Sequence, residues 1–463
     1  MNKKIFIIVL SLFTSVLQIQ AVTPREFRSP NGRITMDFTK SEGLQFFYDR
    51  KLVLTVPQIG LTTTGHGEGA KLDQVLNGSE IVADYTMIEG KRLHCTNRAF
   101  DYYLDYKDAK QQPMRLVVRL YNDGIAMRYE LTGLNNEQLK SELTTYEIPE
   151  GTRRWMMPWS DGAEGFYSLS TTGKGKDRRW GFPALLQPAD DVFVLLTESN
   201  IERRQSAASL HQTSDELYQV RHDKNEVPLT GDWHTPWRVA IVGSLADVVG
   251  STLATDVAEP SKVKDTSWIH PGVVSWVYWA YNHGSNDYTI IKKYVDLAVA
   301  LHLPYVLIDA EWDEMKDGKT IEDAVAYAKE KGVKPMIWYN SSVGWINGAP
   351  GPKFRLNKLE DREKEFAWCE RIGVAGVKID FFAGETQANM DYCIDLLESA
   401  AKYHLLVNFH GATVPRGWQR TYPHLLSTEG VYGAEWYNNV PTFTKRAAAH
   451  NATLPFTRNV IVF

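Results

Sequence analysis

Carboxylate, aromatic and other polar side chains recur directly after apolar runs in the second half of the chain. The residues in question are Trp279, Asn282, His283, Asp309, Glu311, Trp312, Trp338, Lys378, Asp380, Asn408 and His410, and the next segment, Ser427–Trp436, adds Glu429 and Glu435. Glycoside hydrolysis needs two carboxyl groups that flank the scissile bond, and aromatic faces hold sugar rings. The pattern therefore favours a glycosidase.

Lys378 and Asp380 are two residues apart in an apolar run that reads as a strand. Because the side chains of a strand alternate with a period of two, both should point to the same side. A neighbouring cation favours the ionised form of a carboxyl group, which a nucleophile requires. An Asp at a strand end can equally cap the following helix, so Asp380 considered alone leaves both roles open.

An acidic cluster follows the second apolar run, at Asp309, Glu311 and Asp313. It could bind a metal, bind sugar hydroxyls or cap the next helix, and the residues alone leave these three readings open. No histidine-rich ligand set accompanies the cluster, which disfavours a metal-dependent hydrolase centred on it. His283 and His410 could be bases or hydrogen-bonded structural residues.

The elements that must position these residues alternate between strand and helix. The expected strands are Val273–Trp279, Tyr305–Asp309, Lys334–Tyr339, Gly376–Phe382 and Leu405–Phe409; the expected helices are Tyr288–Leu301, Ile321–Lys331, Arg362–Ile372 and Met390–Tyr403. Such a series predicts a parallel sheet that closes as a (β/α)₈ barrel of the TIM type, with its site at the C-terminal strand ends. An open doubly wound sheet is the alternative, but no G-x-G-x-x-G motif supports a nucleotide-binding version.

The first half has a different pattern, with short β-rich runs such as 52–56, 116–120 and 192–196 separated by turn residues. Many strands without helical periodicity indicate a large β-sandwich. We therefore predict an N-terminal β-sandwich domain over residues 22–263 and a catalytic barrel over residues 264–463.

Residues 1–21 have the features of a secretory signal peptide: Lys3 and Lys4, then an apolar stretch, then Ala21 before the expected cleavage point. The prediction is export across the inner membrane to the periplasm. Removal of the two lysines would change the net charge from −5 to −7. This acidic balance argues against nucleic-acid binding, and no later run is long enough for a membrane span.

Only three cysteines occur, Cys95, Cys369 and Cys393, and they are far apart in the chain. An odd number at these spacings predicts buried thiols instead of a disulfide framework or a metal site.

Long motifs in the second half resemble glycoside hydrolase family 97, and specifically its retaining α-galactosidase branch. They are YWAYNHGSNDY (278–288), YVLIDAEWD (305–313), GVKIDFFAG (376–384), LLVNFHGATVPRGW (405–418), TYPHLLSTEGVYGAEWYNN (421–439) and HNATLPFTRNV (450–460). The first half is similar more loosely, through DGAEGFYS (161–168), WGFPALL (180–186) and LLTESNI (195–201).

The resemblance implies roles for individual residues. Asp380 matches the nucleophile and Glu435 the general acid/base, while the residues at the other strand ends would bind the sugar. Members of the family use calcium, and the matching Ca²⁺ ligands are Glu164, Glu429 and Glu435. Oxygen ligands of this kind suit a hard cation.

The resemblance also separates two branches of the family. Inverting α-glucosidases lack the aspartate at the position of Asp380 and carry Glu where this chain has Gly411. The implied activity is therefore exo-acting, retaining release of terminal α-galactose from oligosaccharides or polysaccharide side chains by double displacement. Two alternatives stay open: an α-glucosidase of the same family, and a catalytically impaired carbohydrate-binding fragment. The sequence assigns no oligomeric state.

The length is short for the expected barrel. About 200 residues follow the sandwich, against roughly 250 in a typical complete barrel. The strand series reaches about seven, with Arg458–Val462 as the last. We therefore expect a barrel truncated before its last strand, without the family's C-terminal β domain. Unpaired strand edges would then reduce stability and activity.

Overall fold

The computed structural model describes residues 27–278, 281 and 284–462. The predicted signal peptide and three predicted sugar-binding residues, Trp279, Asn282 and His283, lie outside the described residues.

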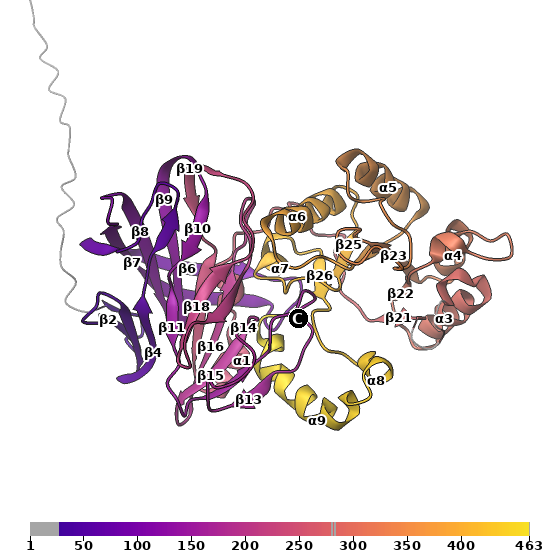
Figure 1. Cartoon of the computed structure of the whole chain (residues 1–463). Helices are drawn as coiled ribbons and strands as arrows, with labels where there is room; N and C mark the ends of the chain where they lie inside the picture. The colour runs from indigo at the N-terminus through magenta and orange to yellow at the C-terminus, as the bar shows by residue number, and fades with distance from the viewer. Residues whose placement is uncertain (1–26, 279–280, 282–283, 463) are drawn as a thin grey trace, which may run out of the picture.

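The first half is a sandwich of two large antiparallel sheets (Figure 1). One sheet has the order β1 (Phe27–Arg28), β2 (Ile34–Phe38), β3 (Leu44–Tyr48), β4 (Lys51–Gln58), β11 (Thr145–Glu147), β18 (Leu217–His222), β17 (Ala208–Gln212), β14 (Arg179–Trp180). The other has the order β13 (Ser168–Ser170), β12 (Arg153–Met156), β15 (Ala184–Ala189), β16 (Val192–Ser199), β20 (Trp237–Gly243), β9 (Gly124–Glu137), β8 (Pro113–Tyr121), β7 (His94–Lys107), β6 (Lys71–Thr86), with β19 (Leu229–His234) beside β9. A small ladder pairs β5 (Leu61–Thr63) with β10 (Leu139–Glu142).

Alternating side chains build the core of the sandwich. In β3, Leu44, Phe46 and Tyr48 are buried while the residues between them are partly exposed. They join one apolar cluster with residues of both sheets. This is the burial pattern expected of an antiparallel strand with one face on a core, and it confirms the sandwich prediction.

The second half contains one parallel sheet of six strands. In order these are β21 (Val274–Trp276), β22 (Tyr305–Ile308), β23 (Lys334–Asn340), β24 (Gly376–Asp380), β25 (Leu406–Phe409) and β26 (Leu425–Thr428). The longer helices are α3 (Tyr288–Ala300), α4 (Ile321–Glu330), α5 (Leu359–Ile372), α6 (Gln387–Lys402) and α9 (Phe443–Thr453). Shorter helical turns are α1 (Leu245–Gly250), α2 (Leu253–Asp256), α7 (Trp418–Thr421), α8 (Trp436–Asn439), η1 (Gly284–Asn286), η2 (Trp312–Glu314), η3 (Leu454–Phe456) and η4 (Arg458–Val460).

The sheet confirms the βα series but forms only part of a barrel within the described residues. β21 pairs only with β22, and β26 only with β25, so the two outer strands do not meet. A complete barrel is therefore not confirmed, and the structure has a half-barrel beside the sandwich.

The expected seventh strand is wrong. Residues 458–460 form the 3₁₀ turn η4, and Val460, Ile461 and Val462 are buried in an apolar cluster with side chains of the sandwich. Arg458 donates to the carbonyls of Gly430 and Thr428. A short apolar run is equally compatible with a strand and with a buried turn, and here tertiary packing selects the turn.

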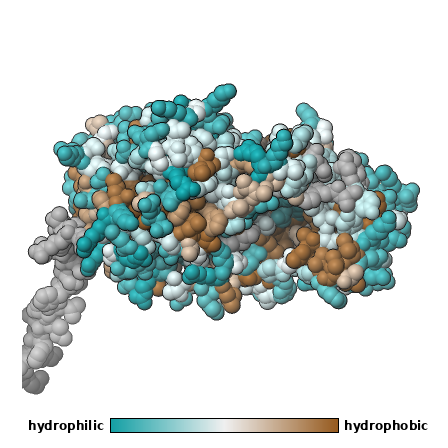
Figure 2. Space-filling model, turned by 90° about the horizontal axis from the view of Figure 1, so that it is seen from below, coloured by the Kyte–Doolittle hydropathy of each residue, from teal (hydrophilic) through white to brown (hydrophobic). Residues whose placement is uncertain are grey.

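The three cysteines are free and buried, as predicted. None of the helices in the described residues is both long and apolar enough to cross a membrane. The apolar side chains that reach the surface gather in separate patches on the face that Figure 2 shows.

A buried chain of charges joins the two halves. In the sandwich, Arg238 pairs with Glu142 and Glu198; from the half-barrel, Arg416 pairs with Glu198 and Glu385. All five side chains are at most 5% exposed. Each arginine lies between two carboxylates, so the charges compensate one another in a region that excludes water.

Candidate active site

A cavity of about 910 Å³ lies between the sandwich and the C-terminal ends of the parallel strands. The half-barrel contributes the strand-end side chains that line it, and a loop of the sandwich, residues 158–168, contributes much of the remaining wall. Its described lining includes Trp159, Glu164, Phe166, Trp276, Tyr278, Asp309, Trp338, Trp345, Lys378, Asp380, His410, Tyr432, Glu435, Trp436 and Arg446. This is the end of the sheet at which the sequence predicted a site.

Asp380 is the last residue of β24, and three donors converge on its buried carboxylate. His410 Nδ1 lies 2.8 Å from Oδ2, Trp338 Nε1 donates to Oδ2 at 3.1 Å, and the Phe381 N–H donates to Oδ1 at 2.7 Å. Burial alone would raise the pKa of Asp380, but the charge and hydrogen bond of His410, with Lys378 and Trp338, hold it below its usual value. The carboxylate is therefore kept ionised.

The backbone after Asp380 is constrained by the loop that follows β23. Phe381 has φ +64°, a left-handed conformation that is unusual for a bulky residue. The hydroxyl of Ser341 and the N–H of Gly344 both donate to its carbonyl, at 2.8 and 3.0 Å. These bonds keep the Phe381 N–H directed at the Asp380 carboxylate.

Gly411 leaves space for this carboxylate. Its φ is +50°, and a Cβ at this position would lie 3.1 Å from Asp380 Oδ1 and 3.2 Å from the Phe381 nitrogen. That spacing is tighter than ordinary van der Waals contact. A larger side chain at position 411 therefore conflicts with the observed position of the Asp380 carboxylate.

Lys378 and Asp309 form a second buried charged group beside Asp380. Lys378 Nζ lies 3.5 Å from Asp309 Oδ2, 3.4 Å from Glu429 Oε2 and 4.3 Å from the ring centre of Trp276. Trp276 Nε1 donates to Asp309 at 2.7 Å. Burial raises the pKa of Asp309, and the Lys378 charge opposes this shift. Both side chains line the cavity, where they can bind sugar hydroxyls.

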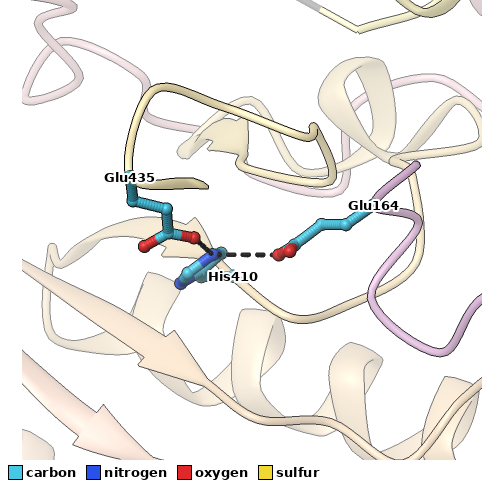
Figure 3. A group of neighbouring side chains, drawn as sticks. All are labelled: Glu164, His410 and Glu435. Carbon is cyan, nitrogen blue, oxygen red and sulfur yellow. Dashed lines mark ion pairs between the residues drawn. The ribbon is translucent and has the colours of Figure 1, made fainter. Parts of the chain in front are cut away.

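Glu164, His410 and Glu435 come together from three distant segments. Figure 3 shows Glu164 of the sandwich loop and Glu435 of the C-terminal segment on either side of the imidazole of His410. His410 Nε2 lies 3.2 Å from Glu164 Oε1 and 3.7 Å from Glu435 Oε1. Trp436 Nε1 donates to the other Glu164 oxygen at 3.0 Å, which fixes the carboxylate across the interface.

The environment of Glu435 differs from that of Asp380. Partial burial raises the pKa of Glu435, and the nearby carboxylates Glu429 and Glu164 raise it further, against the charge of His410. Although burial lowers the pKa of His410, its interactions with Asp380 raise it well above the usual value. The two candidate catalytic carboxyl groups are thus shifted in opposite directions, which suits one for nucleophilic attack and the other for proton donation.

Three of the predicted sugar-binding residues lie elsewhere. Trp312 was expected to bind sugar, but it is 3% exposed in the core, where it stacks on Trp368. Glu311 accepts from Asn286 and does not line the cavity. Asn408 lies on the inner face of the sheet and lines a smaller cavity, to which Trp276 and Lys378 also contribute.

The reason for the Trp312 error is local. Residues after β22 enter the 3₁₀ turn η2, which turns this indole inwards so that Nε1 donates to the Trp338 carbonyl.

The members of the acidic cluster have different partners: Asp309 pairs with Lys378, while Asp313 lies 3.9 Å from Arg355. These carboxylates therefore form no shared metal site.

Several cavity residues were not singled out from the sequence. Trp159 and Phe166 come from the sandwich loop, and Trp345, Tyr432 and Arg446 come from loops and α9 of the half-barrel. The available signals were the DGAEGFYS segment, which includes Phe166, and the TYPHLLSTEGVYGAEWYNN segment, which includes Tyr432. Aromatic residues in loops have no periodicity that would mark them as site residues.

Paired carboxylates with opposite pKa shifts, on the wall of an aromatic-lined cavity at the ends of parallel strands, define a glycosidase site. The chain belongs to glycoside hydrolase family 97. Residues 27–260 match the family model described as Glycosyl-hydrolase 97 N-terminal, and residues 268–431 match the model described as Glycoside hydrolase 97.

Individual relatives agree with this assignment. A probable retaining α-galactosidase of Streptomyces bingchenggensis (strain BCW-1) is 32% identical over 457 residues, which cover 95% of this chain and 68% of the relative. A retaining α-galactosidase of Bacteroides thetaiotaomicron is 26% identical over an alignment that covers 99% of this chain and 75% of the relative. Among solved structures, a β-arabinopyranosidase superposes with a TM-score of 0.87 at 26% identity, covering 94% of this chain and 74% of that one.

Proposed function

We propose that the chain is an exo-acting retaining glycosidase that releases terminal α-galactose, with Asp380 as nucleophile and Glu435 as general acid/base. The observation that carries the proposal is the opposite shift of the two pKa values within one cavity. A carboxyl group whose pKa is lowered, and which is therefore readily ionised, and a second one whose pKa is raised, and which therefore holds its proton more strongly, are the two partners that double displacement needs.

In the first step, an Asp380 oxygen attacks the anomeric carbon while the bond from that carbon to the leaving oxygen breaks. The Glu435 carboxyl group gives its proton to the leaving oxygen, so the products are a glycosyl ester on Asp380 and a free hydroxyl. In the second step, the Glu435 carboxylate takes a proton from water, whose oxygen attacks the anomeric carbon. The ester bond breaks, Asp380 is released as a carboxylate and the sugar leaves with its original configuration.

The choice of α-galactose rests on the names of the relatives. Asp309 and Lys378 supply charged groups for its hydroxyls, and Trp276 supplies aromatic surface in the same wall. A β-arabinopyranoside is the second candidate, because a β-arabinopyranosidase superposes on 94% of this chain. Arabinopyranose lacks the exocyclic CH₂OH group of galactose, so the two substrates differ at one part of the ring.

Calcium is a further part of the proposal, and the donor set fits it in part. Glu164, His410 and Glu435 offer donor atoms within 4.8 Å of one another. Among the described residues, His410 Nε2 makes no well-directed hydrogen bond, and it lies 3.2 Å from Glu164 Oε1 and 3.7 Å from Glu435 Oε1. The predicted ligand Glu429 lies outside this group, with its Oε2 facing Lys378. Glu164 and Glu435 would hold the ion, and its charge would stabilise negative charge developing on nearby oxygens.

The proposed activity is tested with aryl α-galactoside, aryl α-glucoside and aryl β-arabinopyranoside. We expect the galactoside to be cleaved fastest and an Asp380→Gly variant to lose at least roughly 1,000-fold in kcat, because the covalent route is removed. Proton NMR of the first-formed sugar should show the α anomer. A β anomer, or an Asp380→Gly variant as active as wild type, would rule out the mechanism.

Calcium is tested by chelation. We expect EDTA to lower kcat and the melting temperature together, and added Ca²⁺ to restore both, because bound metal stabilises the folded state. A Glu164→Gln variant should need more Ca²⁺ for half-maximal recovery. If EDTA changes neither quantity, the calcium assignment is wrong and the two carboxylates act without metal.

A further inference from the structure

We propose that Trp159 of the sandwich is the stacking platform of a second sugar subsite, which binds the leaving-group ring of an oligosaccharide. The proposal rests on the proposed glycosidase function and assigns a role to a residue that belongs to neither the catalytic pair nor the terminal-sugar pocket. Its ligand class is a pyranose ring joined through the bond to be cleaved.

The sandwich loop packs against the reacting end of the cavity. A Cβ at Gly162 would lie 3.3 Å from the backbone of Gly411, and one at Gly411 would lie 3.1 Å from Asp380. Glu164, two residues further along, contacts His410. Trp159 begins the same loop and lines the same cavity.

Buried groups of the half-barrel fix the polar edge of Trp159. Its Nε1 donates at 3.0 Å to Glu385, which is 4% exposed. Glu385 also accepts from Thr413 at 2.7 Å and pairs with Arg416, so it has little freedom to move. One edge of the indole additionally contacts Gly384, where a Cβ would lie 3.6 Å from two ring carbons.

One face of the indole is already occupied. The Arg179 guanidinium lies 3.4 Å from the ring centre, where it makes a cation–π contact. Arg179 is itself held by Ser209 at 3.0 Å and by Asp223 at 3.4 Å, and its carbonyl accepts from the Trp159 N–H at 3.1 Å. Ring orientation is thus set before any ligand binds, which lowers the entropy cost of stacking a sugar.

The cavity has room for a second ring. Its volume of about 910 Å³ is near the upper end of the range of roughly 300–1,000 Å³ found for small-molecule pockets. Charged and aromatic strand-end residues, including Asp309 and Lys378, form the wall suited to the terminal sugar. Trp159 comes from the sandwich loop and packs against the segment that follows β24, outside this group of strand-end residues, so a ring stacked on it belongs to the leaving group.

Trp159 could instead serve only to anchor the loop that carries Glu164. The two roles differ in how they depend on the leaving group. A loop anchor would change every reaction that uses Glu164, Asp380 or Glu435. A stacking platform changes only reactions whose leaving group is large enough to reach it.

The experiment compares two substrates with the same terminal sugar, the disaccharide α-galactosyl-1,6-glucose and α-galactosyl fluoride, in which fluoride leaves. We expect Trp159→Ala to lower kcat/KM for the disaccharide by about tenfold, the loss of one stacked aromatic contact. For the fluoride, kcat/KM should stay within about twofold of wild type, and Trp159→Phe should recover part of the loss on the disaccharide.

Trp155 provides the matched control, since it lies on β12 of the same domain, packs near Phe193 and does not line the cavity. Trp155→Ala should show no difference between the two substrates. Equal losses on both substrates for Trp159→Ala, or no loss on either, would overturn the subsite while wild-type cleavage upheld the proposed function. If wild type cleaves neither substrate, the proposed function fails, and the subsite fails with it.

Discussion

At the scale of single residues, the site depends on how closely other groups approach one carboxylate. Asp380 accepts from His410, Trp338 and the Phe381 backbone, and a glycine at position 411 keeps its Oδ1 unobstructed. A Cβ at position 411 would lie 3.1 Å from Asp380 Oδ1, so even one methyl group there would push against this carboxylate. This gives a physical reason why an aspartate at 380 and a glutamate at 411 would compete for the same space.

The first prediction concerns Gly411→Ala. We expect kcat to fall roughly tenfold to 100-fold, because the methyl group displaces the Asp380 carboxylate from its position for attack. Stability should fall by about 1 kcal/mol, because alanine at positive φ is strained. Kinetics on an aryl α-galactoside and thermal unfolding measure the two effects.

Gly133→Ala is the control for the strain alone. Gly133 has φ +66°, and a Cβ there meets nothing within 4 Å. The Gly133→Ala variant should therefore lose about as much stability as Gly411→Ala and keep the kcat of wild type. If both variants retain wild-type kcat, crowding of Asp380 is not what requires glycine at position 411.

At the scale of elements, packing between helices and strands shifts the pKa of a buried histidine. His424 follows α7 and is buried, with Nε2 donating to the Leu397 carbonyl of α6 at 2.9 Å, while Nδ1 has no hydrogen-bond partner in the part of the chain that the structure describes. Burial lowers the pKa of His424 to about 4, against the opposing effect of the Leu397 hydrogen bond. The structure around α6 and β26 therefore requires a neutral imidazole.

The second prediction is a loss of stability on acidification. The folded-state pKa lies below the usual histidine value of about 6.5, so the unfolded chain binds this proton more readily. The contribution of His424 is complete above pH 6.5 and is lost as the pH falls from 6.5 towards 4; the loss reaches about 2 kcal/mol at pH 5. Urea unfolding at pH 7.5 and pH 5 measures it.

His424→Gln is the matched variant, because glutamine can donate to Leu397 but does not titrate. Its stability should fall about 2 kcal/mol less between the two pH values than that of wild type. Identical losses for the two proteins would show that His424 is not responsible for the acid sensitivity.

At the scale of the whole molecule, the two halves act as one unit because charges and site residues cross their interface. Arg416 of the half-barrel lies between Glu198 of the sandwich and Glu385, which in turn holds Trp159. The same interface places Glu164 beside His410 (Figure 3). Loss of the interface would therefore remove part of the site as well as stability.

The third prediction concerns Arg416→Met. Removal of the guanidinium leaves Glu198 and Glu385 buried with less compensation, which should lower the free energy of unfolding by about 3–5 kcal/mol. Arg203→Met is the control: Arg203 also joins the halves, through Asp395 and Glu398, but it is 44% exposed. The control should lose at most about 1 kcal/mol, as surface pairs do. Equal losses in urea unfolding would contradict the role of burial.

The sequence by itself determined the β-rich character of the sandwich, four helices and the first five strands of the half-barrel, the buried thiols and the family. These follow from local periodicity and from contiguous motifs, which the order of the residues contains directly. It also placed Asp309, Lys378, Asp380 and His410 at one edge of the sheet, because the C-terminal ends of parallel strands meet there. The catalytic and calcium-binding roles remain predictions.

Tertiary structure alone decided the rest. Burial in the core removed Trp312 from the site, and packing against the sandwich made residues 458–460 a turn. The contacts of Trp159 with Arg179 and Glu385 join segments with no shared periodicity. The physical reason is the same in each case: a side chain's own segment sets its element, but its partners come from segments that only the folded chain brings together.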